Sequence, residues 1–501
     1  MNRFLTFLLL LASTYALGQK AEIKLEAKTD APVISRHIYG QFAEHLGRSV
    51  YDGFYRNGKI REDIVMALKK IKVPNLRWPG GCFADEYHWR DGIRSKATRP
   101  VRINTTWGMV EENNSFGTHE FLDLCERIGC EPYIAGNVGT GTPQEMASWI
   151  EYLNSDSKST LANERRKNGH PKPYGVSFWG VGNESWGCGG DMTPEHYVGL
   201  YKQYASFCET YPGAPKLKKI VSGANAEDYN WTEVCMKNIH WSQMWGVSLH
   251  YYTLITGHWP PSGSATLFGE DEYFNAMQQA LRMEEIVTKH SAIMDKYDPQ
   301  KKAALVVDEW GIWTAQEPGQ PKDWLFQQNS QRDALIAAST LNIFNNHADR
   351  IRVANLAQTV NVIHSVILTK GDQMVLTPTY HVFDMMKVHQ DAKLLPLTIS
   401  SPDYSYGGKS MKAVNASASI KDSTTNITLV NIDPAKEITV KIDVQGISVN
   451  GHLLTAAKIN SFNDFGKRPE VEPAPFTGAK FKDGALMVTL PPKCVVQLAV
   501  R

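Results

Sequence analysis

The feature that most constrains the fold is a regular alternation of short apolar runs and longer amphipathic stretches from residue 38 to residue 356. Eight of the runs are almost continuously apolar, which is typical of parallel strands buried on both faces. Eight strand–helix units in series predict a (β/α)8 barrel of about 350 residues with insertions, and make a doubly wound open sheet the less favoured alternative. The predicted strands are Ile38–Phe42, Asn75–Trp78, Glu131–Asn137, Val176–Val181, Lys219–Gly223, Gly246–Tyr251, Ala304–Val307 and Ile351–Leu356.

The stretches between these strands have the spacing of amphipathic helices. Thr193 and Pro194 form a typical helix start, with threonine as the N-cap and proline at the first helical position. The predicted helices include Arg61–Ile71, Gly117–Ile128, Pro194–Cys208, Glu272–Met294 and Gln331–Asn346.

The sequence pattern changes in the last part of the chain. From residue 395 onward apolar and polar residues alternate, with turn residues such as Asp433-Pro434 between the segments, which predicts an antiparallel β-sandwich of the jelly-roll kind. Ala21–Ala27 alternates in the same way and is predicted to pair with the C-terminal sheet. We therefore expect an N-terminal strand segment at 19–35, a barrel at 36–394 and a β-sandwich domain at 395–501.

The N-terminus and the charge balance restrict the location and the partners. Met1–Arg3 is positively charged and Phe4–Leu11 is apolar, so residues 1–18 are predicted to be a secretory signal peptide. No later stretch reaches about 18 apolar residues, so we expect no membrane span and an exported protein, periplasmic or extracellular. The 53 basic and 52 acidic residues balance without a run of like charge, which argues against nucleic acid as a partner.

The cysteines and histidines give no sign of a metal centre. Seven cysteines are too few for a fold held together by disulfides, and their pairing cannot be read from the sequence. The chain has no C-x-x-C and no H-E-x-x-H pattern, so we expect neither a metal site nor a cofactor.

Two glutamates are the strongest candidates for chemistry, because the active site of such a barrel lies at the C-terminal ends of its strands. Glu184 ends the fourth strand in W-G-V-G-N-E, and Glu309 ends the seventh in V-V-D-E-W. Glycosidic cleavage needs two such carboxyl groups, one protonated for the leaving oxygen and one ionised. Arg77 and a tyrosine hydroxyl would stabilise the charge of Glu309, whereas desolvation near Trp179 and Trp186 would raise the pKa of Glu184.

Five motifs resemble the α-L-arabinofuranosidases of glycoside hydrolase family 51, which belong to the large clan of retaining enzymes with glutamates on strands four and seven. The resemblance runs from about residue 35 to the C-terminus in the order of the family. The motifs are G-Q-F-A-E-H-L-G-R (Gly40–Arg48), N-L-R-W-P-G-G-C-F (Asn75–Phe83), W-G-V-G-N-E (Trp179–Glu184), V-D-E-W-G-I-W (Val307–Trp313) and A-N-L-A-Q-T-V-N-V-I (Ala354–Ile363).

The resemblance implies a role for each matching position. Glu184 would be the general acid/base and Glu309 the nucleophile of a two-step displacement that releases L-arabinose with retention. Arg77 would orient the nucleophile together with Tyr252. Cys82 stands where many relatives have asparagine. The substrate-binding residues would be Glu44, Cys82, Asn183, Tyr252, Gln358, Trp107 and Trp313.

The resemblance leaves the substrate partly open. It implies terminal α-L-arabinofuranosyl residues of an arabinose-containing plant polysaccharide or oligosaccharide, and it favours a homo-oligomer. A retaining β-xylosidase or endo-β-glucanase would use the same two glutamates, because a fold does not fix a substrate. A secreted, non-catalytic carbohydrate-binding protein is the alternative outside the enzymes, and the presence of both glutamates argues against it. In a retaining enzyme the two carboxyl groups should lie about 5–5.5 Å apart.

Overall fold

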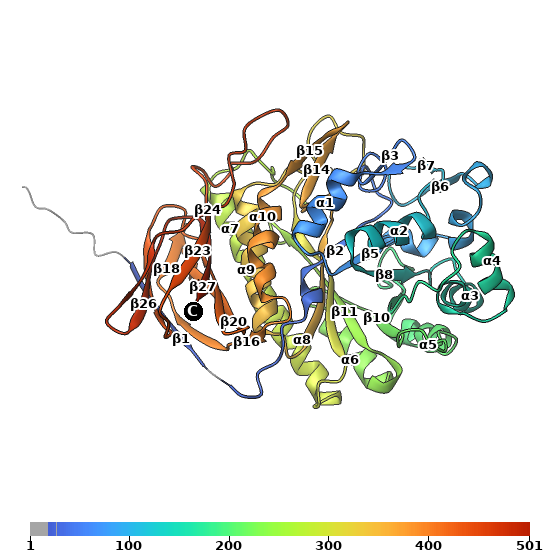
Figure 1. Cartoon of the computed structure of the whole chain (residues 1–501), viewed down its shortest axis with the longest axis horizontal. Helices are drawn as coiled ribbons and strands as arrows, with labels where there is room; N and C mark the ends of the chain where they lie inside the picture. Colours follow the sequence, from blue (N-terminus) through green and yellow to red (C-terminus); the bar gives the residue numbers. More distant parts are fainter. Residues whose placement is uncertain (1–18, 27) are drawn as a thin grey trace, which may run out of the picture.

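The largest part of the molecule is a closed barrel of eight parallel strands (Figure 1). A computed structural model describes residues 19–26 and 28–501. Each predicted apolar run overlaps one barrel strand, and strands that follow one another along the chain are neighbours, so the predicted barrel is confirmed. The strands are β2 (Gly40–Phe42), β5 (Asn75–Trp78), β8 (Glu131–Gly136), β9 (Phe178–Val181), β10 (Lys218–Asn225), β11 (Gly246–Leu254), β12 (Ala304–Trp313) and β13 (Ile351–Ala357).

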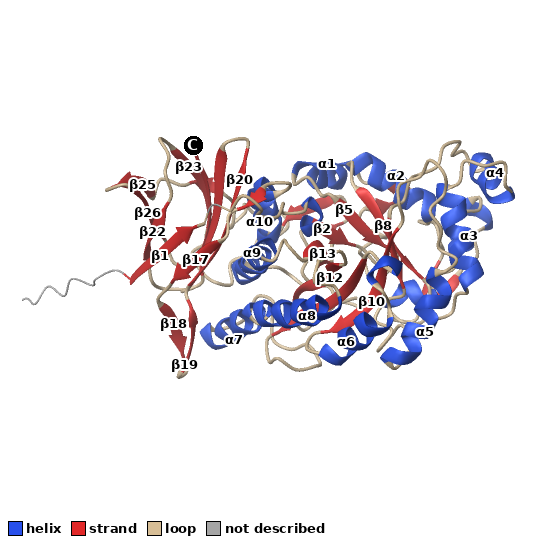
Figure 2. Ribbon diagram, turned by 90° about the horizontal axis from the view of Figure 1, so that it is seen from below, coloured by secondary structure: helices blue, strands red, loops and turns tan. Residues whose placement is uncertain are grey.

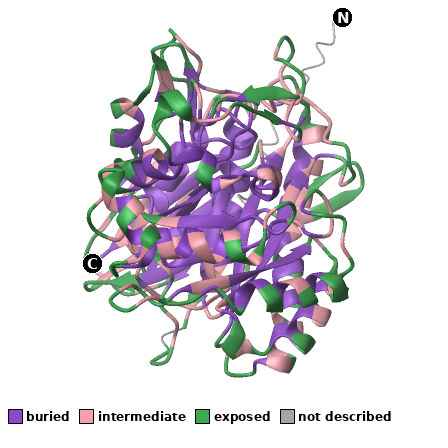
Figure 3. Cartoon of the chain, turned by 90° about the vertical axis from the view of Figure 1, so that its right-hand side faces the viewer, coloured by how far each residue is buried: buried purple, intermediate pink, exposed green. Residues whose placement is uncertain are grey.

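Helices surround the barrel, so that its interior is buried and the outward faces of most helices are exposed (Figure 3). The side chain of Thr193 accepts a hydrogen bond from the amide of His196 and caps α5. The helices are α1 (Glu62–Lys70), α2 (Thr118–Ile128), α3 (Pro143–Asn154), α4 (Thr160–Lys167), α5 (Pro194–Ala205), α6 (Tyr229–Asn238), α7 (Glu270–Leu281), α8 (Met283–Tyr297), α9 (Gln331–Asn346) and α10 (Pro378–Met386).

The prediction of one helix over Glu272–Met294 was wrong, because α7 and α8 share this stretch. The helices meet at Arg282, whose amide donates to the carbonyl of Gln279 three residues earlier, so the backbone tightens there. Neither glycine nor proline marks the position, and the amphipathic spacing continues across it. The break therefore left no local signal in the sequence.

The C-terminal part is a sandwich of two sheets, with strand orders β17-β1-β22-β26-β25 and β16-β20-β21-β27-β23-β24. The N-terminal strand β1 lies in the first sheet, antiparallel to β17 and parallel to β22. The division of the chain at residues 35 and 394 stays a proposal. The strands are β1 (Gln19–Leu25), β16 (Lys393–Leu394), β17 (Leu397–Ser400), β20 (Val414–Lys421), β21 (Thr424–Asn431), β22 (Ile438–Asp443), β23 (Val449–Leu454), β24 (Ala474–Pro475), β25 (Ala479–Lys482), β26 (Ala485–Leu490) and β27 (Cys494–Val500).

Two helices join the barrel to the sandwich. Figure 2 shows α9 and α10 between the two parts, and almost every residue of α9 is buried, because the barrel covers one side and the sandwich the other. Polar contacts fix the junction: Asn342 donates to Asn415 over 2.8 Å, and Asn345 donates to Ser417 over 3.1 Å. The sandwich thereby shares a core with the barrel and supports its shape.

Short hairpins project from the main body. The hairpin of β6 and β7 carries Trp107 at its turn and extends over the mouth of the barrel. The hairpin strands are β3 (Tyr55–Arg56), β4 (Lys59–Ile60), β6 (Arg102–Asn104), β7 (Val110–Glu112), β14 (Ile367–Lys370), β15 (Gln373–Leu376), β18 (Asp403–Tyr406) and β19 (Lys409–Lys412).

Within the residues that the structure covers, no helix is long and apolar enough to cross a membrane.

Candidate active site

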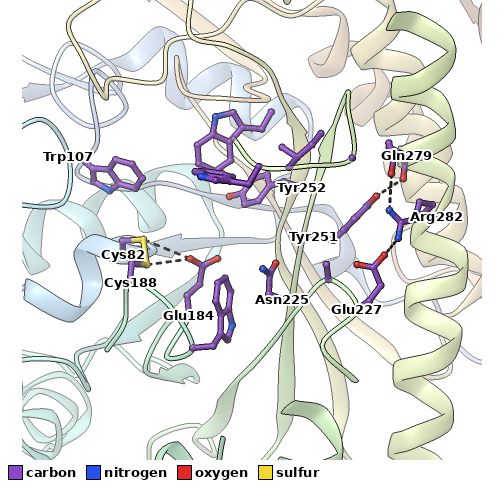
Figure 4. A pocket seen from close by; sticks show the side chains of 16 residues that line it. Cys82, Trp107, Glu184, Cys188, Asn225, Glu227, Tyr251, Tyr252, Gln279 and Arg282 are labelled. Atoms are coloured by element: carbon purple, nitrogen blue, oxygen red, sulfur yellow. Dashed lines mark hydrogen bonds and ion pairs between the residues drawn. A yellow bond between two sulfur atoms is a disulfide. The ribbon is translucent and has the colours of Figure 1, made fainter. Parts of the chain in front are cut away.

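The C-terminal ends of the barrel strands open into two connected chambers. The inner chamber is lined by buried residues that include Glu44, Glu309 and Gln358. The outer chamber is a cavity of about 540 Å³, and its walls hold the residues drawn in Figure 4. Eight of the ten candidate positions line the inner chamber, and Arg77 and Asn183 lie directly behind it. Both chambers are lined by Cys82, Trp107, Glu184, Tyr252 and Trp313.

Glu309 is held by a donor at each carboxylate oxygen. Nη1 of Arg77 donates to Oε1 over 2.7 Å, and the hydroxyl of Tyr252 donates to Oε2 over 2.8 Å. Burial and the charge of Glu309 raise the pKa of Tyr252 well above its usual value, so the hydroxyl keeps its proton and remains a donor. The other branch of Arg77 donates to the side-chain oxygen of Asn183 over 2.6 Å. These contacts fix the orientation of Glu309 before any substrate arrives.

Glu184 lies at the end of β9 in a strained backbone conformation. Its φ of 39° is left-handed, which is rare for a residue other than glycine and is common at functional sites. Its carbonyl accepts from the amides of Gly187 and Gly189, over 2.8 and 3.1 Å, and these bonds fix the turn. Burial raises the pKa of the Glu184 carboxyl, and the charge of Glu309 adds to the shift. The side chain therefore holds a proton more readily than an ordinary glutamate does.

A disulfide packs against the carboxyl of Glu184. Cys82, after β5, is bonded to Cys188, after β9. The two sulfur atoms lie 3.9 and 3.3 Å from Oε2 of Glu184 (Figure 4). Because a disulfide has no S–H group to donate, the contact removes water from this oxygen without stabilising its charge. The pairing could not be read from the sequence, since the two cysteines are 106 residues apart.

His250 and Asp308 form a buried network behind the two glutamates. Nδ1 of His250 lies 2.8 Å from Oε1 of Glu184, and Nε2 lies 3.2 Å from Oδ1 of Asp308. Burial disfavours the imidazolium, but the charge of Glu309 and the bonds to Asp308 and Glu184 outweigh it and raise the pKa of His250 to about 10. His250 is therefore charged at neutral pH and donates from both nitrogens. The hydroxyl of Tyr133 donates to Asp308 over 2.6 Å.

A bulge in β12 lets two consecutive acidic residues face the same site. Adjacent residues of a regular strand point to opposite faces. The pairing of β12 with β13 is irregular between Val307 and Trp310, and the two residues enclosed there are Asp308 and Glu309. Both of them contact Arg77. The extra residue re-aims one side chain, a use of bulges that recurs beside active sites.

Glu44 also lines the inner chamber and accepts hydrogen bonds from several groups. Its Oε1 accepts from the amide of Phe83 over 2.9 Å and from the indole of Trp107 over 2.9 Å, and its Oε2 accepts from Gln358 over 3.1 Å. Burial and the charge of Glu309 raise the pKa of Glu44 to about 7. The bond to Trp107 ties the β6–β7 hairpin to the barrel mouth.

Two glycines allow the backbone after β5 to approach both carboxylates. A Cβ on Gly80 would lie 2.8 Å from Cγ of Glu44, and a Cβ on Gly81 would lie 2.7 Å from Oε1 of Glu309. Real Cβ atoms essentially never come this close, so both positions require glycine for space. This requirement explains the two glycines in the motif R-W-P-G-G-C.

The spacing of the two glutamates suits acid/base and nucleophilic chemistry. One carboxylate oxygen of Glu184 and one of Glu309 lie within 4.8 Å of each other. Inverting glycosidases leave room for a water between carboxyl groups about 6.5–9.5 Å apart, whereas retaining enzymes hold them about 5–5.5 Å apart. The donor set fits a metal ion poorly, since Cys82 and Cys188 are oxidised and His250 is protonated.

Comparison with known proteins identifies the family. Residues 67–254 match the α-L-arabinofuranosidase 1 domain, and residues 308–494 match the α-L-arabinofuranosidase C-terminal domain. The chain is 49% identical over 506 aligned residues to an intracellular exo-α-L-arabinofuranosidase of Bacteroides ovatus, covering 98% of each chain. It is 31% identical to a probable α-L-arabinofuranosidase C of Aspergillus niger, covering 87% of this chain and 92% of the relative.

The Bacteroides ovatus relative corrects the predicted location. The prediction of a signal peptide and of an exported protein is contradicted by the Bacteroides ovatus enzyme, which is similar over almost its whole length and is named intracellular. The residues on which the prediction depended, 1–18, lie outside the described residues. A short basic start followed by an apolar stretch was therefore not sufficient evidence for export.

Solved structures agree with the assignment. The crystal structure of a family 51 arabinofuranosidase from Xanthomonas axonopodis pv. citri is 47% identical, with a TM-score of 0.94 over 96% of this chain and 100% of that chain. An arabinose complex of α-L-arabinofuranosidase from Thermotoga maritima is 31% identical, with a TM-score of 0.83 over 96% and 99% of the two chains. Sequence, fold and the paired glutamates agree, and the chain belongs to the α-L-arabinofuranosidases of glycoside hydrolase family 51.

Proposed function

We propose that Glu309 is the nucleophile and Glu184 the general acid/base of this arabinofuranosidase, which removes terminal α-L-arabinofuranosyl residues with retention. The observation that carries the proposal is the separation of the two carboxylates, whose nearest oxygens lie within 4.8 Å. That spacing leaves little room for the water of an inverting reaction.

In the first step Glu309 attacks C1 of the arabinofuranosyl residue. A covalent bond forms between C1 and a carboxylate oxygen, and the bond between C1 and the leaving oxygen breaks as Glu184 gives that oxygen its proton. Arg77 and Tyr252 keep the carboxylate of Glu309 aimed at C1, because each donates to one of its oxygens.

In the second step water replaces the leaving group. Glu184, now ionised, takes a proton from the water, which attacks C1 and releases L-arabinose and a free Glu309. The charge of His250, 2.8 Å from Glu184, stabilises the ionised form that this step needs. Burial favours the protonated form that the first step needs.

The remaining candidates surround the sugar. Glu44, Asn183 and Gln358 would bind its hydroxyls, since their polar atoms lie at or behind the inner chamber. Trp107 and Trp313 would form its walls. Cys82 would line the chamber through its disulfide with Cys188, which offers an apolar contact in place of a hydrogen-bonding amide.

The proposal also covers the substrate that carries the arabinose and the number of subunits in the enzyme. The substrate would be an arabinose-containing plant polysaccharide or an oligosaccharide derived from it. We also propose a homo-oligomer, as the family resemblance implies, and sedimentation velocity on the wild-type protein would determine the number of subunits.

Two variants test the roles of the glutamates. Glu309→Ala should abolish turnover of an aryl α-L-arabinofuranoside, because no other group can form the covalent intermediate. Glu184→Ala should slow the release of sugar leaving groups by about 10²–10⁴-fold, the usual contribution of a general acid, but spare activated aryl groups that leave without a proton. Aryl release and arabinose release are the two measurements.

The matching aryl β-D-xyloside serves as the substrate control. Turnover of the xyloside without turnover of the arabinofuranoside would keep the mechanism and change the sugar. Activity of Glu309→Ala within tenfold of wild type would remove Glu309 as the nucleophile. Equal loss on aryl and sugar leaving groups in Glu184→Ala would contradict the acid role.

A further inference from the structure

The outer chamber lies on the far side of Glu184 from the nucleophile. Glu184 lines both chambers, whereas Glu309 lines only the inner one. A general acid lies beside the glycosidic oxygen, with the attacked sugar on one side of it and the leaving group on the other. On the proposed roles of the two glutamates, on which this inference rests, the leaving group therefore occupies the outer chamber.

One wall of the outer chamber is a row of aromatic rings leading from the nucleophile to solvent. Tyr252, which donates to Glu309, packs against Trp313 with ring centroids 5.0 Å apart. Trp313 packs against Trp259 at 5.0 Å, and Trp259 is 68% exposed. Flat, amphipathic rings of this kind can cover the apolar faces of sugars.

The helix side of the outer chamber carries a fixed cluster of polar groups. The guanidinium of Arg282 forms an ion pair with Glu227 and donates to the side-chain oxygen of Gln279 over 2.9 Å (Figure 4). The hydroxyl of Tyr251 donates to the main-chain oxygen of Gln279 over 2.6 Å, which anchors this end of α7 to the barrel. The ion pair is only partly buried, at 39% and 38% side-chain exposure, so both groups retain free donors and acceptors.

The end of β10 and the loop after it bring Asn225 and Glu227 into the same chamber. Ala226 between them has a left-handed φ of 45°. The amide of Ala226 donates to the carbonyl of His250 over 2.8 Å, and its own carbonyl accepts from the buried His290 over 2.7 Å. A strained residue held by buried partners indicates a loop whose shape serves the site.

The polar groups of the outer chamber lie at different distances from Glu184. Figure 4 places Asn225 between Glu184 and Glu227, with Arg282 and Gln279 farther away on the helix side. The volume of about 540 Å³ lies within the usual range of small-molecule pockets, about 300–1,000 Å³, so the chamber has room for more than one sugar residue. A leaving group of one residue would reach Asn225, and a second residue would reach Arg282.

We propose that Arg282 and Glu227 bind the second sugar residue of the leaving group, so that the enzyme prefers neutral oligosaccharides with at least two residues beyond the bond it cleaves. Asn225 contacts the first residue. The guanidinium and the carboxylate supply a donor and an acceptor for neighbouring hydroxyls, and Trp259 covers the opposite face of the sugar. The inner chamber selects arabinose, and the outer chamber selects the length of the chain that carries it.

The test compares α-1,5-linked arabinobiose and arabinotriose, whose leaving groups have one and two residues. The measured quantity is the ratio of kcat/KM on arabinotriose to kcat/KM on arabinobiose. A variant that is only partly folded loses apparent kcat/KM by the same factor on both sugars, so its ratio does not change. We expect a ratio of about ten for wild type, a typical gain from one well-placed group of hydrogen bonds, and a ratio near one for Arg282→Ala and Glu227→Ala.

Matched variants separate this role from a structural one. Arg127 on α2 forms a comparable ion pair with Glu62 on α1, away from the chamber, so Arg127→Ala should keep the wild-type ratio. Asn225→Ala should lower kcat/KM on both sugars and leave the ratio unchanged. A wild-type ratio near one, a wild type that cleaves an aryl arabinofuranoside but not arabinotriose, or an unchanged ratio in Arg282→Ala would each overturn the inference. Failure of wild type on all three substrates would instead refute the proposed function.

Discussion

At the scale of single residues, the site depends on the charges that surround each carboxyl. Glu309 faces Arg77, whereas Glu184 faces His250 and a disulfide that removes water. Two carboxyl groups of the same type are thereby placed in different environments, and different environments are how two carboxyl groups of one site acquire different roles.

The first prediction at this scale concerns pH. As the proposed general acid, Glu184 must carry a proton, so activity should fall as pH rises through its pKa. His250 is charged, because its pKa is about 10, and it favours the ionised form of Glu184. Removing that charge in His250→Asn should raise the pKa of Glu184 further and move the alkaline limb of kcat/KM on arabinobiose upward by about one pH unit.

The control for this experiment is another histidine that contacts a carboxylate. His88 lies 3.0 Å from Glu145, away from the two chambers, so His88→Asn should keep the wild-type pH profile. A loss of activity in His250→Asn without a shift of the alkaline limb would mean that His250 acts only as a structural support.

The second prediction at this scale concerns Gly81. In Gly81→Ala the new Cβ would lie 2.7 Å from Oε1 of Glu309 and would push the carboxylate out of line. We expect kcat to fall about 100-fold with little change in KM, because small displacements of a reacting group are costly. Gly199→Ala, where nothing lies within 4 Å of the new Cβ, should leave kcat unchanged. Equal kcat in Gly81→Ala and wild type would show that Glu309 can move without loss.

At the scale of elements, the sequence predicted what depends on local pattern. All eight barrel strands were found because strands buried on both faces are continuously apolar, as in Val176–Val181. The position of Glu184 and Glu309 at the barrel mouth could be predicted because strand ends mark that mouth. The break at Arg282 was missed because a tightened helical turn needs no glycine or proline.

Features that depend on tertiary contacts were also beyond the sequence. The bond between Cys82 and Cys188 joins loops 106 residues apart, and any two of the seven cysteines were equally eligible. The bulge that aims both Asp308 and Glu309 inward depends on the register of β12 against β13. The outer chamber combines Asn225 with Arg282, which belong to different elements and share no motif.

The prediction at the scale of elements concerns the disulfide between Cys82 and Cys188. It connects the loop after β5 to the loop that carries Glu184, and closing a chain segment of 106 residues restricts the unfolded state. Reduction should lower the free energy of unfolding by about 2–4 kcal/mol, as measured by denaturant titration with and without a thiol reductant. Thiol counting in denaturant should give five free cysteines before reduction and seven after it.

A double variant provides the comparison. The double variant Cys82→Ser and Cys188→Ser should be as unstable as the reduced wild type and should not respond to the reductant. Cys130→Ser, which removes one of the free thiols, should respond as the wild type does. Seven free thiols before reduction would refute the bond.

At the scale of the whole molecule, the barrel and the sandwich are packed together, and we expect them to unfold as one unit. The buried helix α9 contacts both parts, and β1 belongs to the sandwich although it precedes the barrel in the chain. His389 in the 3-10 helix Lys387–His389 connects them as well: its ring nitrogens lie 2.7 Å from the hydroxyl of Ser419 on β20 and 2.8 Å from that of Thr428 on β21.

This junction should weaken in acid. Burial lowers the pKa of His389 to about 3, so the folded protein keeps the ring neutral, whereas the unfolded chain binds a proton below about pH 6.5. The stability that His389 contributes is therefore complete above pH 6.5 and is lost as pH falls toward 3. Between pH 7 and pH 5 this one group should cost wild type about 2 kcal/mol of unfolding free energy.

Comparison with His389→Gln isolates that contribution from all other titrating groups. Glutamine cannot be protonated, so urea unfolding should show the variant less stable than wild type at pH 7, with the difference shrinking by about 2 kcal/mol at pH 5. The exposed His196 on α5 supplies the control, and His196→Gln should differ from wild type by the same amount at both pH values. A difference for His389→Gln that did not change with pH would mean that the ring is charged in the folded state, and that the junction between barrel and sandwich tolerates a buried cation.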